Sequence, residues 1–238
     1  MSSLWCAIGN SSEWKIKNKW KVSCGIVDKQ SLVVNGKPKT SYNKKEFKLE
    51  SVIFKLDKGD VGSCPTDKKP AGGYPYSGRQ EITHRLPTGH TIFETDIIVE
   101  GAPSARSTLF QIHDGRNKGA PPSWIGVGGD WKIKHKFPKG ECSSENCKMI
   151  KYFYLEPDKE YRFKAEINYE KSAKNLSIRY YLNDVFILQH LNVPLSKKNT
   201  DGPYGPSKPY IKIGIYRIGE TGTTTYSYKN LIIKNKKK

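Results

Sequence analysis

Three stretches of the sequence carry side chains capable of acid–base chemistry, and each has the pattern of a β-strand with one polar face. The first is FQIHDG, residues 110–115. Successive side chains of an extended strand alternate between its two faces, so Phe110 and Ile112 share one face while Gln111 and His113 share the other. This strand therefore presents an amide and an imidazole side by side, opposite two apolar residues.

The segment YIKIGIY, residues 210–216, shows the same period of two. Its three isoleucines fall on one face and belong in a core. The opposite face displays a lysine between two tyrosines, with a glycine that lets another group approach the backbone closely. The residues of this polar face are Tyr210, Lys212, Gly214 and Tyr216.

The third stretch is SGRQEITHRL, residues 77–86. Alternation puts Arg79 and Glu81 on one face, and Gln80, Ile82 and His84 on the other. This strand therefore adds a guanidinium and a carboxylate to the candidate site.

A concave sheet with these three faces on adjacent strands would present Arg79, Gln111, His113, Lys212 and Tyr216 to one substrate. Removing a proton next to a carboxylate requires that carboxylate to be neutralised, and Arg and Gln are suitable donors. Histidine is the natural base near neutral pH, and a tyrosine hydroxyl can protonate a leaving sugar oxygen. The set predicts β-elimination on a uronic acid polymer, a mechanism in which we expect neither a metal nor a cofactor.

The same motifs resemble, in the same order, the signature strands of jelly-roll alginate lyases. RQE (79–81), QIH (111–113) and YIKIGIY (210–216) are similar to the patterns R-[ST]-E-[LV]-R, Q-[IV]-H and Y-F-K-x-G-x-Y-x-Q. QIHDGRNKGAPPSWIGV and FETDIIVEG also resemble the related glucuronan lyases. The resemblance covers roughly residues 75–233 and implies a polysaccharide lyase that cleaves a 1,4-linked polyuronate.

By this resemblance, Arg79 and Gln111 bind the substrate carboxylate, His113 is the base, and Tyr216 is the acid or the combined acid and base. Glu81 would orient Arg79, and Lys212 would contact the sugar chain. The flanks depart from the family patterns, since Thr83 replaces a second arginine, Ile218 replaces the final glutamine and Ile211 replaces a phenylalanine. The reaction class is therefore better supported than the identity of the uronate.

The rest of the chain predicts an all-β protein. Alternating segments separated by Gly, Pro, Asn and Asp clusters favour a β-jelly roll, a concanavalin-like sandwich of two antiparallel sheets with a concave substrate groove. Besides residues 77–86, the expected strands are 91–100, 107–113, 124–137, 161–170, 176–189, 210–219 and 224–234, with a hairpin turn at Asn183 and Asp184. We expect one catalytic domain over residues 1–238, with a frayed basic tail at about 234–238.

The formal net charge of +18, from 41 Lys and Arg against 23 Asp and Glu, predicts a polyanionic partner. We favour an acidic polysaccharide over nucleic acid, because Arg is scarce and no nucleic-acid motif is present. Tyr210 on the polar strand face is a further candidate sugar contact, as are Tyr74 and Tyr76 in the Pro- and Gly-rich segment before Arg79.

The cysteines and the other histidines point to structural roles. The spacing of Cys142 and Cys147 would suit a small disulfide loop, and Cys6 with Cys24 is a possible second pair, which would leave Cys64 over; the sequence does not settle the pairing. No ligand pattern for zinc is complete. His84, His90, His135 and His190 have no partner motif, and Trp124 and Trp131 are expected in the core rather than stacked on sugar rings.

Two other functions remain open at this stage. A glycoside hydrolase on the same scaffold would need two facing carboxylates, and Glu94 and Asp96 share a strand face. A non-catalytic carbohydrate-binding jelly roll would use the site without its chemistry. His113 could also be an ordinary strand histidine, Tyr216 a packing residue and Arg79 a surface partner of Glu81.

The sequence contains no apolar run of about twenty residues, so we expect no membrane span. We expect a monomeric protein that is extracellular or secreted, although no secretory signal is visible at the start of the sequence.

Overall fold

The computed structural model describes residues 14–16, 18–23, 32–39, 46–61, 77–101, 103, 106–114, 121–137, 142–195, 208–218 and 222–236. Tyr74, Tyr76, Cys6, Cys24 and Cys64 lie outside these ranges, so the predictions for them stay predictions. In the described residues, the regular secondary structure is all strand, as predicted, and no helix is long and apolar enough to cross a membrane.

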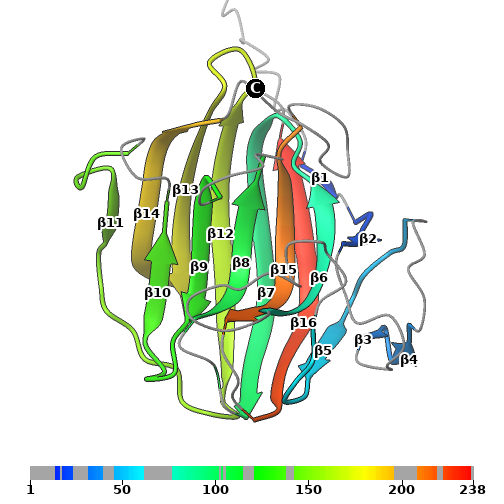
Figure 1. Ribbon diagram of the computed structural model, residues 1–238. Coiled ribbons are helices and arrows are strands. Elements are labelled where there is room, and N and C mark those ends of the chain that lie inside the picture. The colour runs from blue at the N-terminus through cyan, green and yellow to red at the C-terminus, as the bar shows by residue number, and fades with distance from the viewer. Residues whose placement is uncertain are drawn as a thin grey trace, which may run out of the picture.

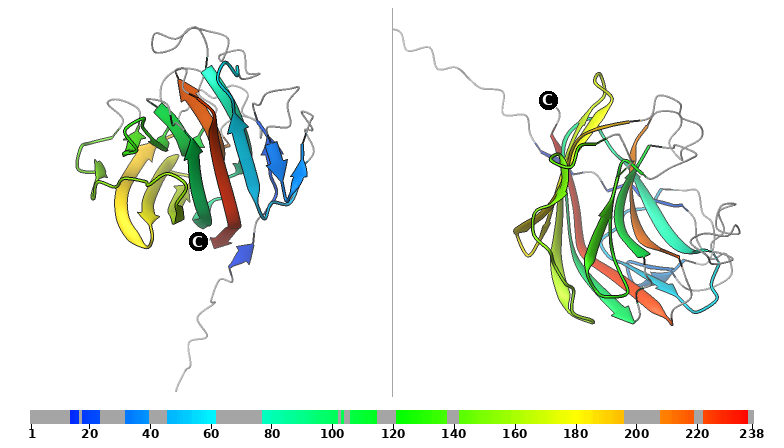
Figure 2. Two further views of the ribbon diagram at one scale, coloured as in Figure 1. Left: turned by 90° about the horizontal axis from the view of Figure 1, so that it is seen from below. Right: turned by 60° about the vertical axis from the view of Figure 1, so that its left-hand side comes forward.

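The described strands form two antiparallel sheets, called here the large sheet and the small sheet, which pack face to face (Figures 1 and 2). The large sheet has the order β11 (Cys147–Met149), β14 (Val185–Pro194), β13 (Asn175–Leu182), β12 (Glu160–Glu170), β7 (Gly89–Gly101), β16 (Thr224–Lys236), β5 (Val52–Leu56), β3 (Leu32–Val34) and β4 (Lys37–Pro38), with β1 (Lys15–Ile16) paired to β16. The small sheet has the order β10 (Ile133–Lys136), β9 (Ser123–Val127), β8 (Arg106–His113), β15 (Tyr210–Ile218), β6 (Ser77–Arg85) and β2 (Lys21–Val22). This is the jelly-roll sandwich expected from the sequence.

The core between the sheets is made by the apolar half of each alternating strand. Phe110 from the small sheet packs against Phe93, Phe163 and Tyr180 from the large sheet, with ring centroids 5.1–5.9 Å apart. Each of these four side chains is buried, and burial of a side chain of this size contributes roughly 1.5–3 kcal/mol. Because the inward faces are fixed by this cluster, the alternate residues of the same strands must point outward.

Two predicted strands are hairpins in the structure. The expected strand 176–189 turns at Asn183 and Asp184, whose φ angles of 47° and 60° confirm the predicted turn. The expected strand 124–137 is split into β9 and β10, because Trp131 adopts a φ of 59° in the connection. Trp131 is partly buried and packs against the core.

The predicted frayed tail is wrong for most of its length. Lys234, Asn235 and Lys236 belong to β16 and pair with Ile92, Thr91 and His90 of β7. The Asn235 amide also donates to the carbonyl oxygens of Thr88 and His90, at 3.2 and 3.1 Å. Backbone pairing with β7 and the hydrogen bonds of Asn235 therefore fix residues 234–236, although the lysines of this segment favoured a frayed, solvated end.

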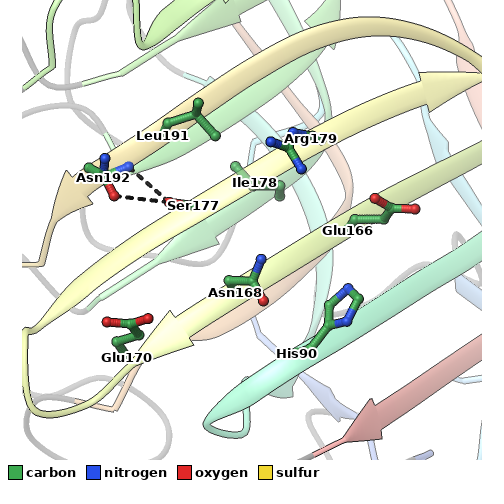
Figure 3. Close-up of a pocket in the computed structure, with 9 residues that line it drawn as sticks. All are labelled: His90, Glu166, Asn168, Glu170, Ser177, Ile178, Arg179, Leu191 and Asn192. Carbon is green, nitrogen blue, oxygen red and sulfur yellow. Dashed lines mark hydrogen bonds between the residues drawn. The ribbon is translucent and has the colours of Figure 1, made fainter. Parts of the chain in front are cut away.

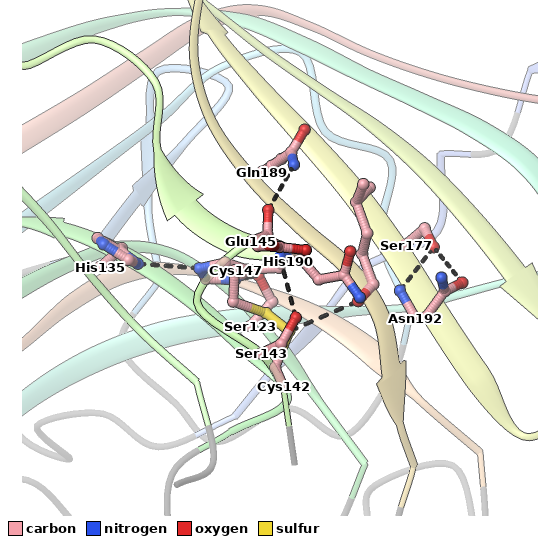
Figure 4. The surroundings of a disulfide bond; sticks show 12 residues. Ser123, His135, Cys142, Ser143, Glu145, Cys147, Ser177, Gln189, His190 and Asn192 are labelled. Atoms are coloured by element: carbon pink, nitrogen blue, oxygen red, sulfur yellow. Dashed lines mark hydrogen bonds between the residues drawn. A yellow bond between two sulfur atoms is a disulfide. The ribbon is translucent and has the colours of Figure 1, made fainter. Parts of the chain in front are cut away.

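The predicted disulfide between Cys142 and Cys147 is present, with the two Cα atoms 5.9 Å apart. It closes a short loop against β14, where Gln189 donates to the carbonyl oxygen of Glu145 at 3.1 Å (Figure 4). The disulfide thus ties Cys142 to β11, the edge strand of the large sheet.

Candidate active site

The three strands singled out by sequence are neighbours in the small sheet, in the order β8, β15, β6 (Figure 1). Antiparallel pairing sets Lys212 opposite Gln111, Tyr210 opposite His113, and Tyr216 opposite Arg79. Directly paired residues share a sheet face. Ile211, Ile213 and Ile215 of β15 are fully buried on the core side, so the polar residues that alternate with them and their partners on β8 and β6 lie on the outward face of the small sheet.

Glu81 joins the residues of this face together. Its side chain is 0 % exposed and accepts a hydrogen bond from the Gln111 amide at 2.7 Å and from Lys212 Nζ at 2.6 Å. Arg79 Nη1 lies 3.8 Å from the same carboxylate. Gln111 and Lys212 are themselves 5 % and 4 % exposed, so this is a buried ionic network.

The network keeps Glu81 ionised despite its burial. Burial raises the pKa of Glu81, but the positive charges of Lys212 and Arg79 and the hydrogen bond from Lys212 outweigh it, so the pKa lies below its ordinary value. An ionised Glu81 holds one N–H of the Gln111 amide and leaves the second N–H as a donor for another acceptor.

Arg79 and Tyr216 form one end of the site. The guanidinium carbon of Arg79 lies 4.0 Å from the centroid of the Tyr216 ring, a cation–π arrangement. The Arg79 side chain is 13 % exposed, so it is neither a solvated surface partner of Glu81 nor sealed from a ligand. The tyrosine ring and the Glu81 carboxylate thus hold the guanidinium from two sides.

His113 and Tyr210 form the other end. Their rings stack with centroids 5.4 Å apart and planes at 17°. The pKa of His113 is lowered to about 4, mainly by burial and also by the charge of Lys212, against an opposing effect of Asp114 and Glu81. His113 is therefore neutral at pH 7, which is the state that accepts a proton.

A β-bulge in β15 lies between the two ends. The pairing with β8 shifts register between Ile213 and Arg217, and Gly214 has a φ of 131°. A Cβ at this position would come within 2.2 Å of the Gln80 carbonyl oxygen on β6. The close approach predicted for Gly214 is therefore to a neighbouring strand, and the bend of a bulge re-aims the side chains around it.

Asp114 was not singled out by the sequence. It is buried beside His113 and its charge raises the pKa of that histidine. Its position before Gly115 suggested only a turn residue. Lys212, in contrast, was predicted to contact the sugar chain and is buried against Glu81, so its charge acts within the network.

Comparison with known protein families identifies the family of this chain. The sequence model of the polysaccharide lyase family matches residues 67–231. The chain belongs to the polysaccharide lyase family. It is an enzyme of the lyase class, as its motifs predicted.

Similar solved structures agree on the fold of this polysaccharide lyase. The alginate lyase A1-II′, a member of polysaccharide lyase family 7, has a TM-score of 0.55 at 14% identity, over 93% of this chain and 96% of that chain. The alginate lyase AlgAT5 of the same family has a TM-score of 0.52 at 14% identity, over 91% and 94%. An alginate lyase from Corynebacterium sp. has a TM-score of 0.51 at 12% identity, over 91% and 93%. A search of the curated proteins by sequence gave no match.

The carboxylates considered for a hydrolase lie on the opposite side of the lyase. Glu94 and Asp96 point outward from β7 in the large sheet, where they pair with Lys164 and Arg162 of β12. Glu94 lies 3.8 Å from Arg162, and Asp96 accepts a hydrogen bond from Asn230 at 2.7 Å. These acids thus have basic or amide partners on a face that does not carry Arg79 or His113.

A polar cavity of about 340 Å³ opens on that same outward face of the large sheet (Figure 3). His90, Glu166, Asn168, Glu170 and Arg179 are among the residues that line it. None of the predicted site residues that the structure describes lines this cavity.

The remaining buried histidine pair of the lyase is structural. His190 Nδ1 lies 2.7 Å from Ser123 Oγ and its Nε2 lies 3.0 Å from His135 Nδ1 (Figure 4). Burial, together with the nearby His135, lowers the pKa of His190 to about 3. Ser123 and His190 are fully buried between the sheets, so they link the sheets out of reach of a substrate.

Trp124 is buried as predicted, but not between the sheets. It is paired with Gln111 and therefore lies on the outward face of the small sheet. Its indole N–H donates to Thr108 Oγ1 at 2.6 Å, and a Cβ on Gly126 would come within 2.5 Å of its ring. The absence of a side chain at Gly126 lets this indole lie flat against β9.

Proposed function

We propose that this polysaccharide lyase cleaves a 1,4-linked polyuronate, either alginate or glucuronan, by β-elimination. The observation that carries the proposal is the buried Glu81, which holds Gln111 and Arg79 on one sheet face with His113 and Tyr216. The three similar structures described above are of alginate lyases. A fourth, of the alginate lyase A1-II′ in complex with its substrate, has a TM-score of 0.55 at 12% identity.

In this mechanism, the uronate carboxylate binds to Arg79 and to the second N–H of the Gln111 amide. Negative charge builds up on that carboxylate as the proton leaves C5, and preorganised donors stabilise it. Glu81 positions both donors. Its negative charge is balanced mainly by the closer Lys212, so the Arg79 guanidinium keeps positive charge for the substrate carboxylate.

His113 then takes the proton from C5. The C4–O bond breaks, a C4=C5 double bond forms, and the leaving oxygen receives a proton from Tyr216. The pKa of about 4 leaves the free imidazole neutral but weakly basic. A bound carboxylate adds negative charge near the ring, which raises the pKa of His113 toward the working pH and strengthens the base.

The stereochemistry at C5 determines which residue acts as base. Where C5 presents its proton on the side of the leaving oxygen, Tyr216 would serve as both base and acid. Activity on one uronate and not another would therefore report which face of the sugar ring meets His113.

The test is ultraviolet absorbance of the enzyme mixed separately with polyglucuronate, polymannuronate, polyguluronate and a neutral glucan. Absorbance from a new C=C bond conjugated to the carboxylate should rise with at least one polyuronate, and should not rise with His113→Ala or with the glucan. Reducing ends released from the glucan would instead indicate a hydrolase, and tight polymer binding without any product would indicate a binding module.

A further inference from the structure

The outward face of the small sheet continues beyond the candidate site. Gln111 is paired with Trp124 of β9, and Trp124 is paired with Lys136 of β10. Lys134, two residues away on β10, is paired with Gly126. Because paired residues share a face, both lysines lie on the same side of the sheet as Gln111 and His113.

Residues 152–155 extend this face past β10. Lys132 and Tyr154 form an isolated antiparallel bridge, flanked by a hydrogen bond from Ile133 N to the Phe153 carbonyl oxygen at 2.9 Å and one from Leu155 N to the Trp131 carbonyl oxygen at 3.0 Å. Strand alternation then puts Tyr152 on the same face as Tyr154. The set Lys132, Lys134, Lys136, Tyr152 and Tyr154 is called here the β10 strip.

The two tyrosines of the β10 strip are held in place yet open to solvent. Tyr152 is 77 % and Tyr154 is 55 % exposed. Phe153, between them, packs against Tyr161 with ring centroids 5.7 Å apart, and Leu155, after them, is buried. Because these alternate residues are anchored inward, the backbone of the segment is fixed. Binding to the exposed rings therefore costs little backbone conformational entropy.

The charge of the β10 strip is positive and accessible. Lys132 Nζ lies 5.3 Å from the Tyr154 ring centroid, and Lys136 is exposed. Lys134 Nζ lies 3.2 Å from the Asp130 carboxylate, with both side chains more than two-fifths exposed. Such an exposed pair is weak, so the ammonium remains available to another anion.

The spacing of the strands separates the β10 strip from the chemistry. Neighbouring strands lie about 4.8 Å apart, so the bridged segment around Tyr154 is roughly 14 Å from β8 across the sheet. The lysines on β10 are nearer, because β10 is two strand spacings, or roughly 10 Å, from β8. At these separations the β10 strip faces sugar units next to the one that reacts at His113. A long polymer would extend across the intervening strand.

We propose that the β10 strip is a remote binding site for the acidic polysaccharide chain, where lysines pair with uronate carboxylates and tyrosine rings pack against sugar rings. This inference rests on the proposed polyuronate substrate. Lysines act as point charges and tolerate variation in the position of a carboxylate, while a tyrosine offers an apolar face with a polar tip. The β10 strip therefore selects a long anionic chain without defining the cleavage step.

Binding energy from a remote part of the substrate lowers KM for long chains and cannot act on chains too short to reach it. The triple variant Lys132→Ser, Lys134→Ser and Lys136→Ser removes the charge of the β10 strip, and Tyr152→Ala with Tyr154→Ala removes its rings. A matched control, Lys55→Ser with Lys171→Ser and Lys229→Ser, removes three exposed lysines outside the small sheet and changes the net charge equally.

The affinity of each variant for fluorescently labelled polymannuronate, polyguluronate and polyglucuronate is measured by titration in a His113→Ala background, so that the polymer is not cut. Both β10-strip variants should lose at least about fivefold in affinity for a polyuronate that the unaltered strip binds, and the control triple less than about twofold. With His113 restored, KM for the long polymer should rise several-fold while kcat/KM for a trisaccharide stays within about twofold.

Equal affinity losses in the β10-strip and control triples would overturn the proposal, because they would show a general effect of net charge. An equal loss of kcat/KM on the trisaccharide and on the polymer would also overturn it, since the residues would then act in the cleavage site. The affinity titration needs no turnover, so an enzyme that binds polyuronate through the β10 strip but yields no unsaturated product would refute the proposed reaction and leave this site standing.

Discussion

The outward faces of the two sheets both carry alternating charged side chains, but they bury them differently. On the large sheet, Glu94 and Arg162 lie 3.8 Å apart with side chains 20 % and 54 % exposed. On the small sheet, Glu81 and Lys212 lie 2.6 Å apart and are almost completely inaccessible. The first pair is a solvated surface contact, and the second is part of a network that includes Arg79 and Gln111.

This difference separates a face of solvated charges from a face whose charges are buried against one another. Exposed ion pairs contribute little, typically 0–1 kcal/mol, because water screens them. Buried charges are costly unless they are fully partnered, and perturbed pKa values gather where a site has been built. Burial of charge, more than its presence, therefore distinguishes the face that carries the proposed site from the opposite face.

The strongest contrast between the two faces should be in turnover. His113→Ala and Tyr216→Phe should each lower kcat on the preferred polyuronate by about 10²–10⁴-fold, since each removes a proton-transfer group. Tyr210→Phe, which keeps the ring stacked on His113, and Glu94→Gln on the large sheet should each change kcat by less than about threefold. Loss of activity in Tyr210→Phe with retention in Tyr216→Phe would move the role of acid to Tyr210.

The two carboxylates should also differ in their contribution to stability. Glu81→Gln leaves the Lys212 ammonium buried without a carboxylate and should lower the free energy of unfolding by about 3–5 kcal/mol. Glu94→Gln should lower it by less than about 1 kcal/mol. Urea denaturation measures both, and the double variant Glu81→Gln with Lys212→Met should regain most of the loss; no recovery would contradict a charge-balancing role for Lys212.

A subtler measurement tests the electrostatics of the small-sheet face. The ring of His113, assigned by comparison with His113→Ala, should titrate by NMR with a pKa of about 4. Because the unfolded chain takes up this proton at its ordinary pKa near 6.5, the His113 contribution to stability is complete above that pH and is lost as pH falls toward 4. In inactive Tyr216→Phe, a bound uronate tetrasaccharide should move the midpoint upward; a free-enzyme midpoint near 6.5 would contradict the structure.

Strand alternation was enough to predict the faces of this site. Phe110, Ile112 and three isoleucines of β15, at positions 211, 213 and 215, belong to the core, and Gln111 and His113 lie opposite them, because side chains of a strand alternate between its two faces. The adjacency of the three strands was assumed for a concave sheet and their order β8, β15, β6 was not predicted, since pairing between residues about a hundred positions apart leaves no local signal.

Other features could not be predicted from the pattern. Strand alternation puts Lys212 on an outward face, where a lysine is expected to be solvated. Its ammonium is instead buried, because it binds the carboxylate of Glu81 on the neighbouring strand. Trp124 was expected between the sheets because tryptophan is apolar, but the bare backbone of Gly126 gives it a buried place on the outward side. Both outcomes depend on a partner on another strand.

The order of the strands has a consequence for how the molecule folds. β16 lies between β7 and β5 in the large sheet, and β15 lies between β8 and β6 in the small sheet, so each of the last two described strands is an interior strand of one sheet. During synthesis, the earlier strands must wait with unpaired edges until residues 208–236 have emerged. Such long-range pairing slows folding and exposes edges to aggregation. We therefore expect translation pausing before residue 208 to lower the yield of native enzyme, even where the finished protein is stable.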